Sequence, residues 1–216
     1  DSVPSQNSRQ LAASITTQLK NGMYEVTMEG YYKTMTDLIT YKAGYSNLSS
    51  TESWENAIET GGVGKSYGLE LFVQKKKGAT TGWIGYTLSW TNRQFENINF
   101  GEWYPYKYDR RHDFSIVLSH KLSDRIDFGA TWVYGTGNAI NFPQAVYLGL
   151  PYQGWVGQNI DLVESYGDRN SVRMNPYHRL DFGANFHKEH KQYSRTWSIG
   201  AYNVYNRKNP FFVYLS

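Results

Sequence analysis

The residues most suited to binding chemistry lie in a charged run at positions 109–113, Asp-Arg-Arg-His-Asp. The planar guanidinium groups of Arg110 and Arg111 match the oxygens of carboxylates and phosphates, so both are candidate ligand-contacting residues. The same arginines can instead pair with Asp109 and Asp113. We expect such an ion-pair network at the end of a strand more than an anion site.

Aromatic side chains form the second group of candidates. Trp103, Tyr104 and Tyr106 precede the charged run, and Tyr152 and Trp155 lie in a long segment with few charges. Rings of this kind in loops can stack on a sugar, a peptide or a siderophore. They can equally pack the loop on itself or on a surface lipoprotein, and both alternatives stay open.

Motifs for catalysis are missing from the sequence. Residues 61–66 (GGVGKS) resemble a phosphate-binding loop, but Glu59 stands where that motif needs glycine and a strand pattern follows instead of a helix. Cysteine is absent, and no serine has the spacing of a nucleophile elbow. The sequence therefore predicts neither an enzyme nor a cofactor.

The five histidines do not form a metal motif. His187 and His190 flank a Lys-Glu pair, a spacing without known ligand geometry, so we expect solvated turn residues there. His112, His120 and His178 lie next to predicted strands, and we expect each of them to be a hydrogen-bonded residue of the sheet.

Composition narrows the class of protein. The chain has 216 residues, a net charge of +3 and a mean hydropathy of −0.62. The charge is too small to predict a nucleic-acid partner, and no run reaches the roughly 18 apolar residues of a spanning helix. Aromatic residues make up 17% of the chain, which favours β-structure. A β-barrel stays possible because its strands carry polar residues at alternate positions.

A period of two in hydrophobicity predicts the elements that must position these residues. In the clearest segment Leu180, Phe182 and Phe186 alternate with Arg179 and Asp181. Eight segments share the pattern, at about 11–19, 24–32, 67–73, 84–90, 114–118, 126–134, 180–186 and 197–201. A ninth begins at Phe211.

The apolar positions are spaced as a lipid-facing band would require. Lys65 and Lys75 lie on the apolar face of one strand, about 33 Å apart at ~3.3 Å per residue. A strand tilt of about 40° reduces this to a height of about 25 Å, that of the apolar band of a barrel. The predicted lipid-facing residues are Leu69, Leu71, Val73, Phe114, Ile116, Phe128, Trp132, Leu180, Phe182 and Phe186.

Connections between the segments alternate in length. Those near residues 20–22, 78–80, 123–125 and 188–192 are tight, whereas 42–60, 97–107 and 136–174 are long. Outer-membrane barrels have this asymmetry. We therefore predict an all-β, antiparallel, up-and-down transmembrane β-barrel with a single partial barrel domain at 1–216. A soluble β-sandwich is the alternative, since it also alternates.

The expected strands do not close by themselves. Residues 211–215 start an odd strand, and residues 2–10 have the composition of a loop. Because a lipid-embedded sheet cannot leave an edge unpaired, we expect a piece of a longer barrel. An eight-stranded closed barrel with an extra tail is the rival.

Six stretches, taken in this order, resemble the C-terminal barrel half of TonB-dependent receptors, particularly those of Bacteroidetes-type outer membranes. They are SYGLELFVQK (66–75), GWIGYTLS (82–89), YKYDRRHD (106–113), ATWVYGTG (130–137), NPYHRLDFG (175–183) and YNVYNRKNP (202–210). The resemblance implies a 22-stranded barrel, of which this chain supplies about eight strands, plugged by an N-terminal domain. The plug, the energiser-binding box, the early strands and the terminal aromatic strand end of that family are missing from this sequence.

Function follows from the resemblance only as an expectation. It implies energised import of a nutrient ligand across the outer membrane of a Gram-negative bacterium, with siderophore, glycan and peptide all open. The implied partners are outer-membrane lipid, the rest of the barrel and its plug, the TonB energising complex and a surface lipoprotein. The alternatives are a small stand-alone outer-membrane barrel for adhesion or envelope anchoring, and a soluble carbohydrate-binding β-sandwich.

Overall fold

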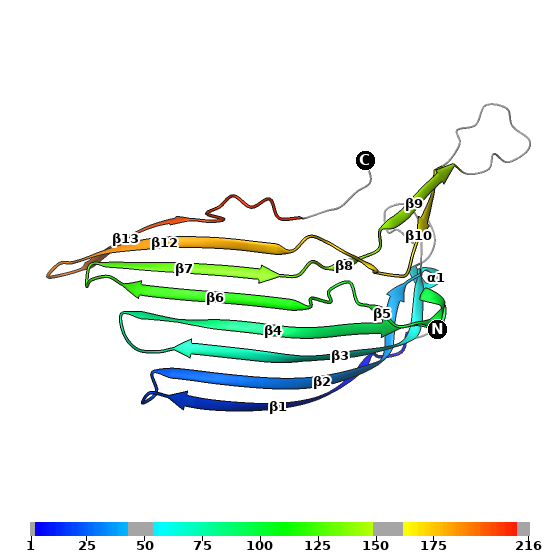
Figure 1. The fold of residues 1–216 in the computed structure, drawn as a ribbon, viewed down its shortest axis with the longest axis horizontal. Helices are drawn as coiled ribbons and strands as arrows, with labels where there is room; N and C mark the ends of the chain where they lie inside the picture. Colours follow the sequence, from blue (N-terminus) through cyan, green and yellow to red (C-terminus); the bar gives the residue numbers. More distant parts are fainter. Residues whose placement is uncertain (1–2, 43–53, 149–161, 211–216) are drawn as a thin grey trace, which may run out of the picture.

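The computed structural model describes residues 3–42, 54–148 and 162–210, and it is dominated by one antiparallel sheet (Figure 1). Eight long strands follow one another in the order β1-β2-β3-β4-β6-β7-β12-β13, each beside its predecessor in this order. Their bounds are β1 Asn7–Leu19, β2 Tyr24–Tyr41, β3 Ile58–Lys75, β4 Thr80–Gln94, β6 His112–Lys121, β7 Ile126–Gly135, β12 Tyr177–Glu189 and β13 Ser194–Ala201. The eight predicted strands and their up-and-down order are confirmed.

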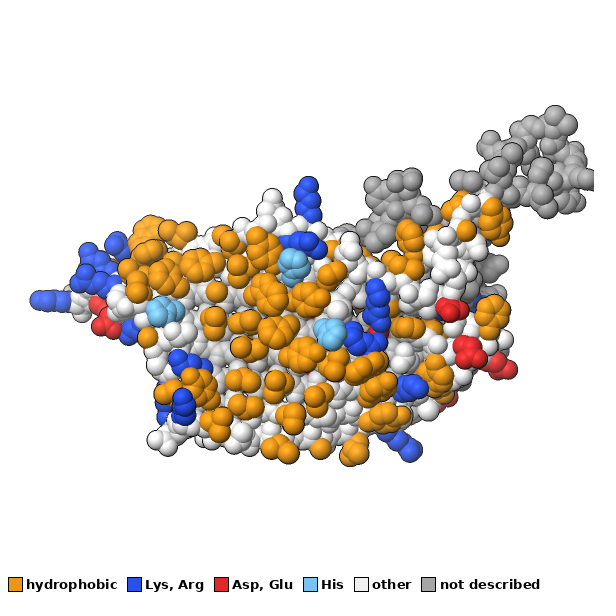
Figure 2. Space-filling view, in the orientation of Figure 1, with side chains coloured by type: hydrophobic (Ala, Val, Ile, Leu, Met, Phe, Trp, Pro, Cys, Tyr) orange, Lys and Arg blue, Asp and Glu red, His pale blue; other side chains and the backbone are white. Residues whose placement is uncertain are grey.

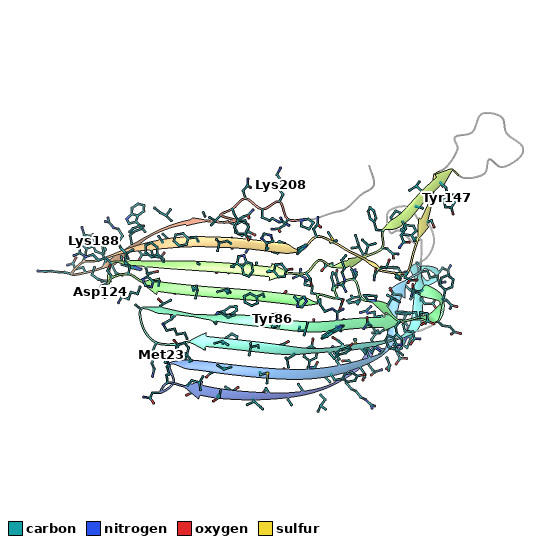
Figure 3. The ribbon with its side chains drawn as sticks, in the orientation of Figure 1. Met23, Tyr86, Asp124, Tyr147, Lys188 and Lys208 are labelled. Carbon is teal, nitrogen blue, oxygen red and sulfur yellow. The ribbon has the colours of Figure 1, made fainter. Side chains whose placement is uncertain are left out.

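The two ends of the sheet differ as predicted. Four-residue turns connect the strands at one end, at 20–23, 76–79, 122–125 and 190–193. The other end carries the long connections, which hold α1 Trp54–Ala57, η1 Asn99–Gly101, β5 Tyr104–Pro105, β8 Ala139–Ile140, β9 Pro143–Leu148, β10 Leu162–Tyr166 and β11 Val172–Arg173. Figure 3 places Asp124 and Lys188 at the tight-turn end and Tyr147 on the hairpin that projects from the loop end.

Strand register gathers the apolar residues on one face of the sheet. One cross-strand row runs Val73, Ile84, Ile116, Trp132 and Leu180. All ten predicted lipid-facing residues lie on this face, which we call the apolar face. Figure 2 shows hydrophobic side chains spread across it from edge to edge.

Side chains of the apolar face are exposed. Leu11 and Ile15 retain 78% and 73% of their accessible surface, and Phe182 and Phe186 retain 46% and 41%. No second sheet of the described residues covers them, because the remaining strands form only small two-stranded pairings at the loop end and β5 beside β4. The inward-facing core that a soluble sandwich requires is thus lacking in the part of the chain that the structure describes.

The opposite face of the sheet carries hydrogen-bonded polar side chains. Thr16 and Thr27 meet at 2.9 Å across β1 and β2, and Asn185 Nδ2 donates to Asp127 Oδ2 at 2.8 Å. Arg179 and Asp181 form an ion pair at 2.9 Å. We call this surface the polar face.

Aromatic rings border the apolar face. Tyr32, Tyr67 and Trp90 stack in one row near the loop end, with ring centroids 6.2 and 5.3 Å apart. At the tight-turn end Lys20 lies 5.9 Å from the ring of Tyr24. Aromatic side chains in such positions are typical of membrane–water interfaces.

Buried packing is confined to the loop end. Leu38, Phe95, Ile98 and Tyr104 form a cluster in which each residue is at most 3% exposed, and Met35 packs against it. None of these residues lies on the apolar face of the eight long strands, which we call the wall strands. Among the described residues, no helix is long and apolar enough to cross a membrane.

Two sequence-based expectations are wrong in detail. Residues 7–10 belong to β1 and do not form a loop, because Asn7 pairs with Thr36 and Gln10 pairs with Lys33. Their side chains are polar, so the sequence shows no hydrophobic alternation there. His187 is a strand residue bonded to Asp127 and to Thr196 Oγ1, so it is not a solvated turn residue.

The described sheet is open. β1 and β13 are its two edges and do not pair with each other, so the eight strands do not form a closed barrel. Residues 211–215, expected to start a ninth strand, lie outside the described residues. The three other expected histidine contacts are confirmed: His112 with Tyr86, His120 with Thr80 and His178 with Tyr205, at 2.8–2.9 Å.

Candidate ligand cleft at the loop end

A cleft of about 440 Å³ opens where β2, β4 and β5 meet the long connections. Register with Gly64 and Met35 places Arg93, near the end of β4, on the polar face of the sheet. The volume is within the range of small-molecule sites. The described residues that line the cleft are Gln6, Ile39, Thr40, Tyr41, Ile58, Arg93, Tyr104, Tyr106, Lys107, Arg169 and Asn170.

Short strand β5 forms one wall of this cleft. Its pairing with β4 sets Tyr104 opposite Arg93 and holds the phenol ring in the buried cluster. The guanidinium of Arg93 stacks on Tyr106, 3.6 Å from the ring centroid. Burial raises the pKa of Tyr104, against the opposing effect of the positive charges of Arg169 and Arg93. The phenol of Tyr104 is therefore a neutral donor at physiological pH.

A second wall comes from a distant part of the chain. The backbone N–H of Arg169 donates to Asn99 Oδ1 at 2.7 Å, and Asn170 Nδ2 donates to the carbonyl of Pro105 at 2.9 Å. Arg169 Nη2 also reaches the carbonyl of Tyr41 at 3.5 Å. These bonds join residues 65 to 128 positions apart and bring Arg169 to the cleft.

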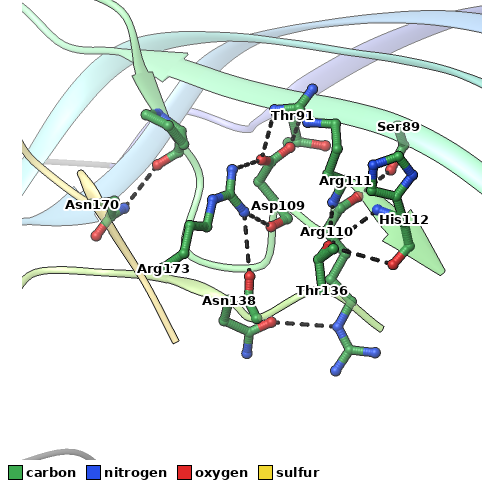
Figure 4. Close-up of polar contacts among 12 residues, drawn as sticks. Ser89, Thr91, Asp109, Arg110, Arg111, His112, Thr136, Asn138, Asn170 and Arg173 are labelled. Carbon is green, nitrogen blue, oxygen red and sulfur yellow. Dashed lines mark hydrogen bonds and ion pairs between the residues drawn. The ribbon is translucent and has the colours of Figure 1, made fainter. Parts of the chain in front are cut away.

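Next to the cleft, Asp109 is the centre of a charged network (Figure 4). Its carboxylate is 1% exposed, accepts from the backbone N–H of Thr91 at 2.6 Å, and pairs with Arg111 at 3.3 Å and with Arg173. Arg173 also donates to the backbone carbonyl of Asp109. Burying a carboxylate without partners is unfavourable, and these contacts supply them. Because Arg173 belongs to β11, the network also ties β11 to the connection between β4 and β6.

The rest of the charged run is structural as well. Arg110 pairs with Asp113 at 3.2 Å, and Thr136 Oγ1 accepts from the backbone N–H of Arg111 at 2.8 Å. The guanidinium of Arg111 lies 4.5 Å from the ring of Trp90. The expected ion-pair network at the end of the strand is confirmed.

The predicted ligand-contacting residues have different surroundings. Tyr104 and Tyr106 line the cleft, whereas Trp103 lies outside it with Lys65 Nζ 4.2 Å from its ring centroid. Arg110 and Arg111 belong to the network around Asp109. Tyr152 and Trp155 lie outside the described residues. Contact between any of these residues and a ligand remains a prediction.

Sequence reasoning missed the basic side chains of the cleft. Arg93, Lys107 and Arg169 come from separate parts of the chain, and only Lys107 stands in one of the stretches that carry the resemblance. Arg93 near the end of a predicted strand was the one available signal, because strand ends meet the loops that carry binding residues.

Metal binding has no structural support in the described ranges, where no group of three histidine, cysteine or acidic side chains could hold an ion. The chain matches no protein-family model, and no curated protein sequence is significantly similar to it.

Proposed function

We propose that this chain is part of the wall of an outer-membrane β-barrel of the TonB-dependent receptor type, which takes part in energised import of a nutrient ligand. In this assignment the apolar face contacts acyl chains and the polar face lines the barrel interior. The tight turns lie on the periplasmic side, and the long connections lie on the outer side of the membrane.

One observation carries the proposal: a continuous apolar face, eight strands wide, that nothing described covers. A fully exposed Leu, Ile or Phe side chain gives up roughly 1.5–3 kcal/mol of burial free energy in water. A face of such residues is therefore unfavourable in water and favourable in hydrocarbon. The row of Tyr32, Tyr67 and Trp90 at its border supports the same environment.

The two open edges of the sheet support a barrel larger than eight strands. In hydrocarbon each unpaired backbone group of an edge costs several kcal/mol, so β1 and β13 both require further strands beside them. These strands would come from the remainder of the same barrel, with the plug inside it and the TonB complex acting on the plug.

Basic side chains gather at the tight-turn end, where Figure 2 shows a blue group. Lys77 Nζ donates to the carbonyl of Asn21, and Lys76 pairs with Glu25, so these lysines lie directly at the turns. Anionic lipid headgroups attract lysines in this position. The charge distribution therefore supports a turn end at a membrane surface.

The reading frame upstream of Asp1 tests the assignment. A receptor requires a region that encodes a plug domain and the early strands. A signal peptide directly before Asp1 would overturn the receptor assignment and favour a small stand-alone barrel for adhesion or anchoring. A full-length chain that stays monomeric in water without detergent would overturn both membrane assignments and favour a soluble protein.

A further inference from the structure

We propose that the cleft beside β5 binds a small, soluble ligand through an oxyanion group, a carboxylate or a phosphate. The inference rests on the proposed function only for its location, because a cleft on the polar face belongs to the interior side of the wall. It adds the chemical class of the ligand, which the fold alone leaves open.

Charge in the cleft is unbalanced. Arg93, Lys107 and Arg169 line it, and none of its described lining residues is acidic. Glu59 follows Ile58 of the lining but does not itself line the cleft, and its carboxylate accepts a hydrogen bond from Asn97 Nδ2 at 2.8 Å. Three like charges in one concavity repel one another and raise the local concentration of anions.

The basic residues of the neighbouring network differ from those of the cleft, because they pair with carboxylates. Arg111 and Arg173 pair with Asp109, and Arg110 pairs with Asp113. The cations of the cleft contact rings and a carbonyl instead: Arg93 stacks on Tyr106, and Arg169 lies 5.7 Å from the ring of Tyr104. Their charge is therefore available to a ligand.

Arg93 is fixed and yet incompletely bonded. Its Nε atom is buried and has no hydrogen-bond partner among the described residues. A buried donor without a partner is unfavourable, and native proteins keep few of them. Stacking on Tyr106 holds the guanidinium plane in place, so the part of this group that lines the cleft is oriented for a planar oxyanion.

Polar hydroxyls and rings complete the site. Tyr106 and Tyr41 give the cleft flat apolar surfaces beside the three cations, whereas Tyr104 is only 3% exposed. A ligand that combines an oxyanion with a ring or a short carbon skeleton would use both properties. Arg93 lies on the polar face, away from the apolar face, which favours a soluble ligand over a lipid headgroup.

Calorimetric titration of the full-length protein in detergent micelles tests the inference, with citrate and pyrophosphate as probes and a neutral trisaccharide as control. We expect at least one anion to bind and the trisaccharide to bind at least tenfold more weakly. The anion that binds more tightly identifies the oxyanion as a carboxylate or a phosphate. Arg169→Gln and Lys107→Gln should each weaken anion binding about five- to tenfold.

Lys191→Gln is the matched control variant, because Lys191 is exposed in a turn at the opposite end of the sheet. It should leave anion binding unchanged. Binding of neither anion, equal binding of the trisaccharide, or an Arg169→Gln variant equal to wild type would overturn the inference. Vesicles of anionic lipid that compete fully with the better probe would also overturn it, since they would identify a headgroup site.

Failure of the inference and failure of the proposed function give different results. A protein that inserts into membranes but binds neither anion contradicts only the ligand class. A water-soluble chain that binds citrate and loses it in Arg169→Gln contradicts only the membrane assignment.

Discussion

The wall strands and the loop end place hydrophobic side chains in opposite environments. On the wall, Leu11 and Ile15 are mostly exposed, whereas Phe95 and Ile98 at the loop end are 2% and 3% exposed. The loop end thus has the buried core of a water-soluble protein, and the wall has none on its apolar face. The proposed assignment accounts for both arrangements, with hydrocarbon around the wall and water around the loops.

Charged side chains follow the same division. The carboxylate of Asp109 is buried among arginines at the loop end, whereas the ion pair of Lys121 with Asp124 at a tight turn is exposed. On the described part of the apolar face, register places lysine only near the borders, at Lys65, Lys75 and Lys188. Removing one group from each environment tests whether the division is real.

The largest effect is expected at the buried network. Asp109→Ala leaves Arg173 and Arg111 without a carboxylate. Breaking a buried ion pair costs several kcal/mol of stability. Because both arginines are partly exposed, we expect a loss of about 3 kcal/mol here. Urea unfolding in detergent and proteolysis of the loop end would measure it. Asp113→Ala removes an exposed pair and should cost less than about 1 kcal/mol. Equal effects of the two variants would contradict the buried role of Asp109.

On the wall, Leu180→Asp places a charge on the apolar face. We expect a loss of about 2 kcal/mol near mid-bilayer, measured as a smaller fraction of protein assembled in membranes. Ser115→Asp, on the polar face of β6, is the control and should assemble normally. If Leu180→Asp assembles as well as the control, the apolar face does not contact lipid.

Glycine substitutions compare the packing of the two regions. A Cβ at Gly62 would lie 2.3 Å from the ring of Phe95, so Gly62→Ala overpacks the loop-end cluster and should cost about 1–2 kcal/mol. A Cβ at Gly129 in β7 has nothing within 4 Å, and Gly129→Ala should be nearly neutral. Unfolding in urea measures both variants. A neutral Gly62→Ala would contradict tight packing against Phe95.

The smallest effect is a loss of loop-end stability at high pH. Burial raises the pKa of Tyr104 above its usual value of 10.0, so the folded state holds this proton more tightly than the unfolded state. The contribution is complete below pH 10 and is lost as the pH rises through the pKa of the folded protein. Proteolysis of the loop end across this range should show the loss, and Tyr104→Phe should reduce it. An unchanged pH profile in that variant would assign the loss to other groups.

Sequence alone predicted the wall well. The alternation of Leu180, Phe182 and Phe186 with polar neighbours reflects a local rule, since successive side chains of a strand point to opposite faces. The tight turns were equally visible. What the pattern did not predict was the polar start of β1, which pairing with β2 determines.

The loop end was harder to predict, because its contacts join distant residues. Arg169 reaches Asn99 across 70 positions, and Arg173 reaches Asp109 across 64. No periodicity or motif signals such pairs. The ion-pair network was predicted because its members at 109–113 are neighbours in sequence, whereas the basic cleft was not.

The environment of the apolar face is the central claim, and quenching of a fluorophore by lipid tests it most directly. The chain has no cysteine, so Phe182→Cys and Gly183→Cys each offer one labelling site, on the apolar and the polar face of β12. In vesicles with nitroxide-bearing acyl chains, we expect strong quenching of the label at 182 and little at 183, with the reverse order for aqueous iodide. A label at 182 that neither quencher reaches, or that iodide reaches best, would contradict the account.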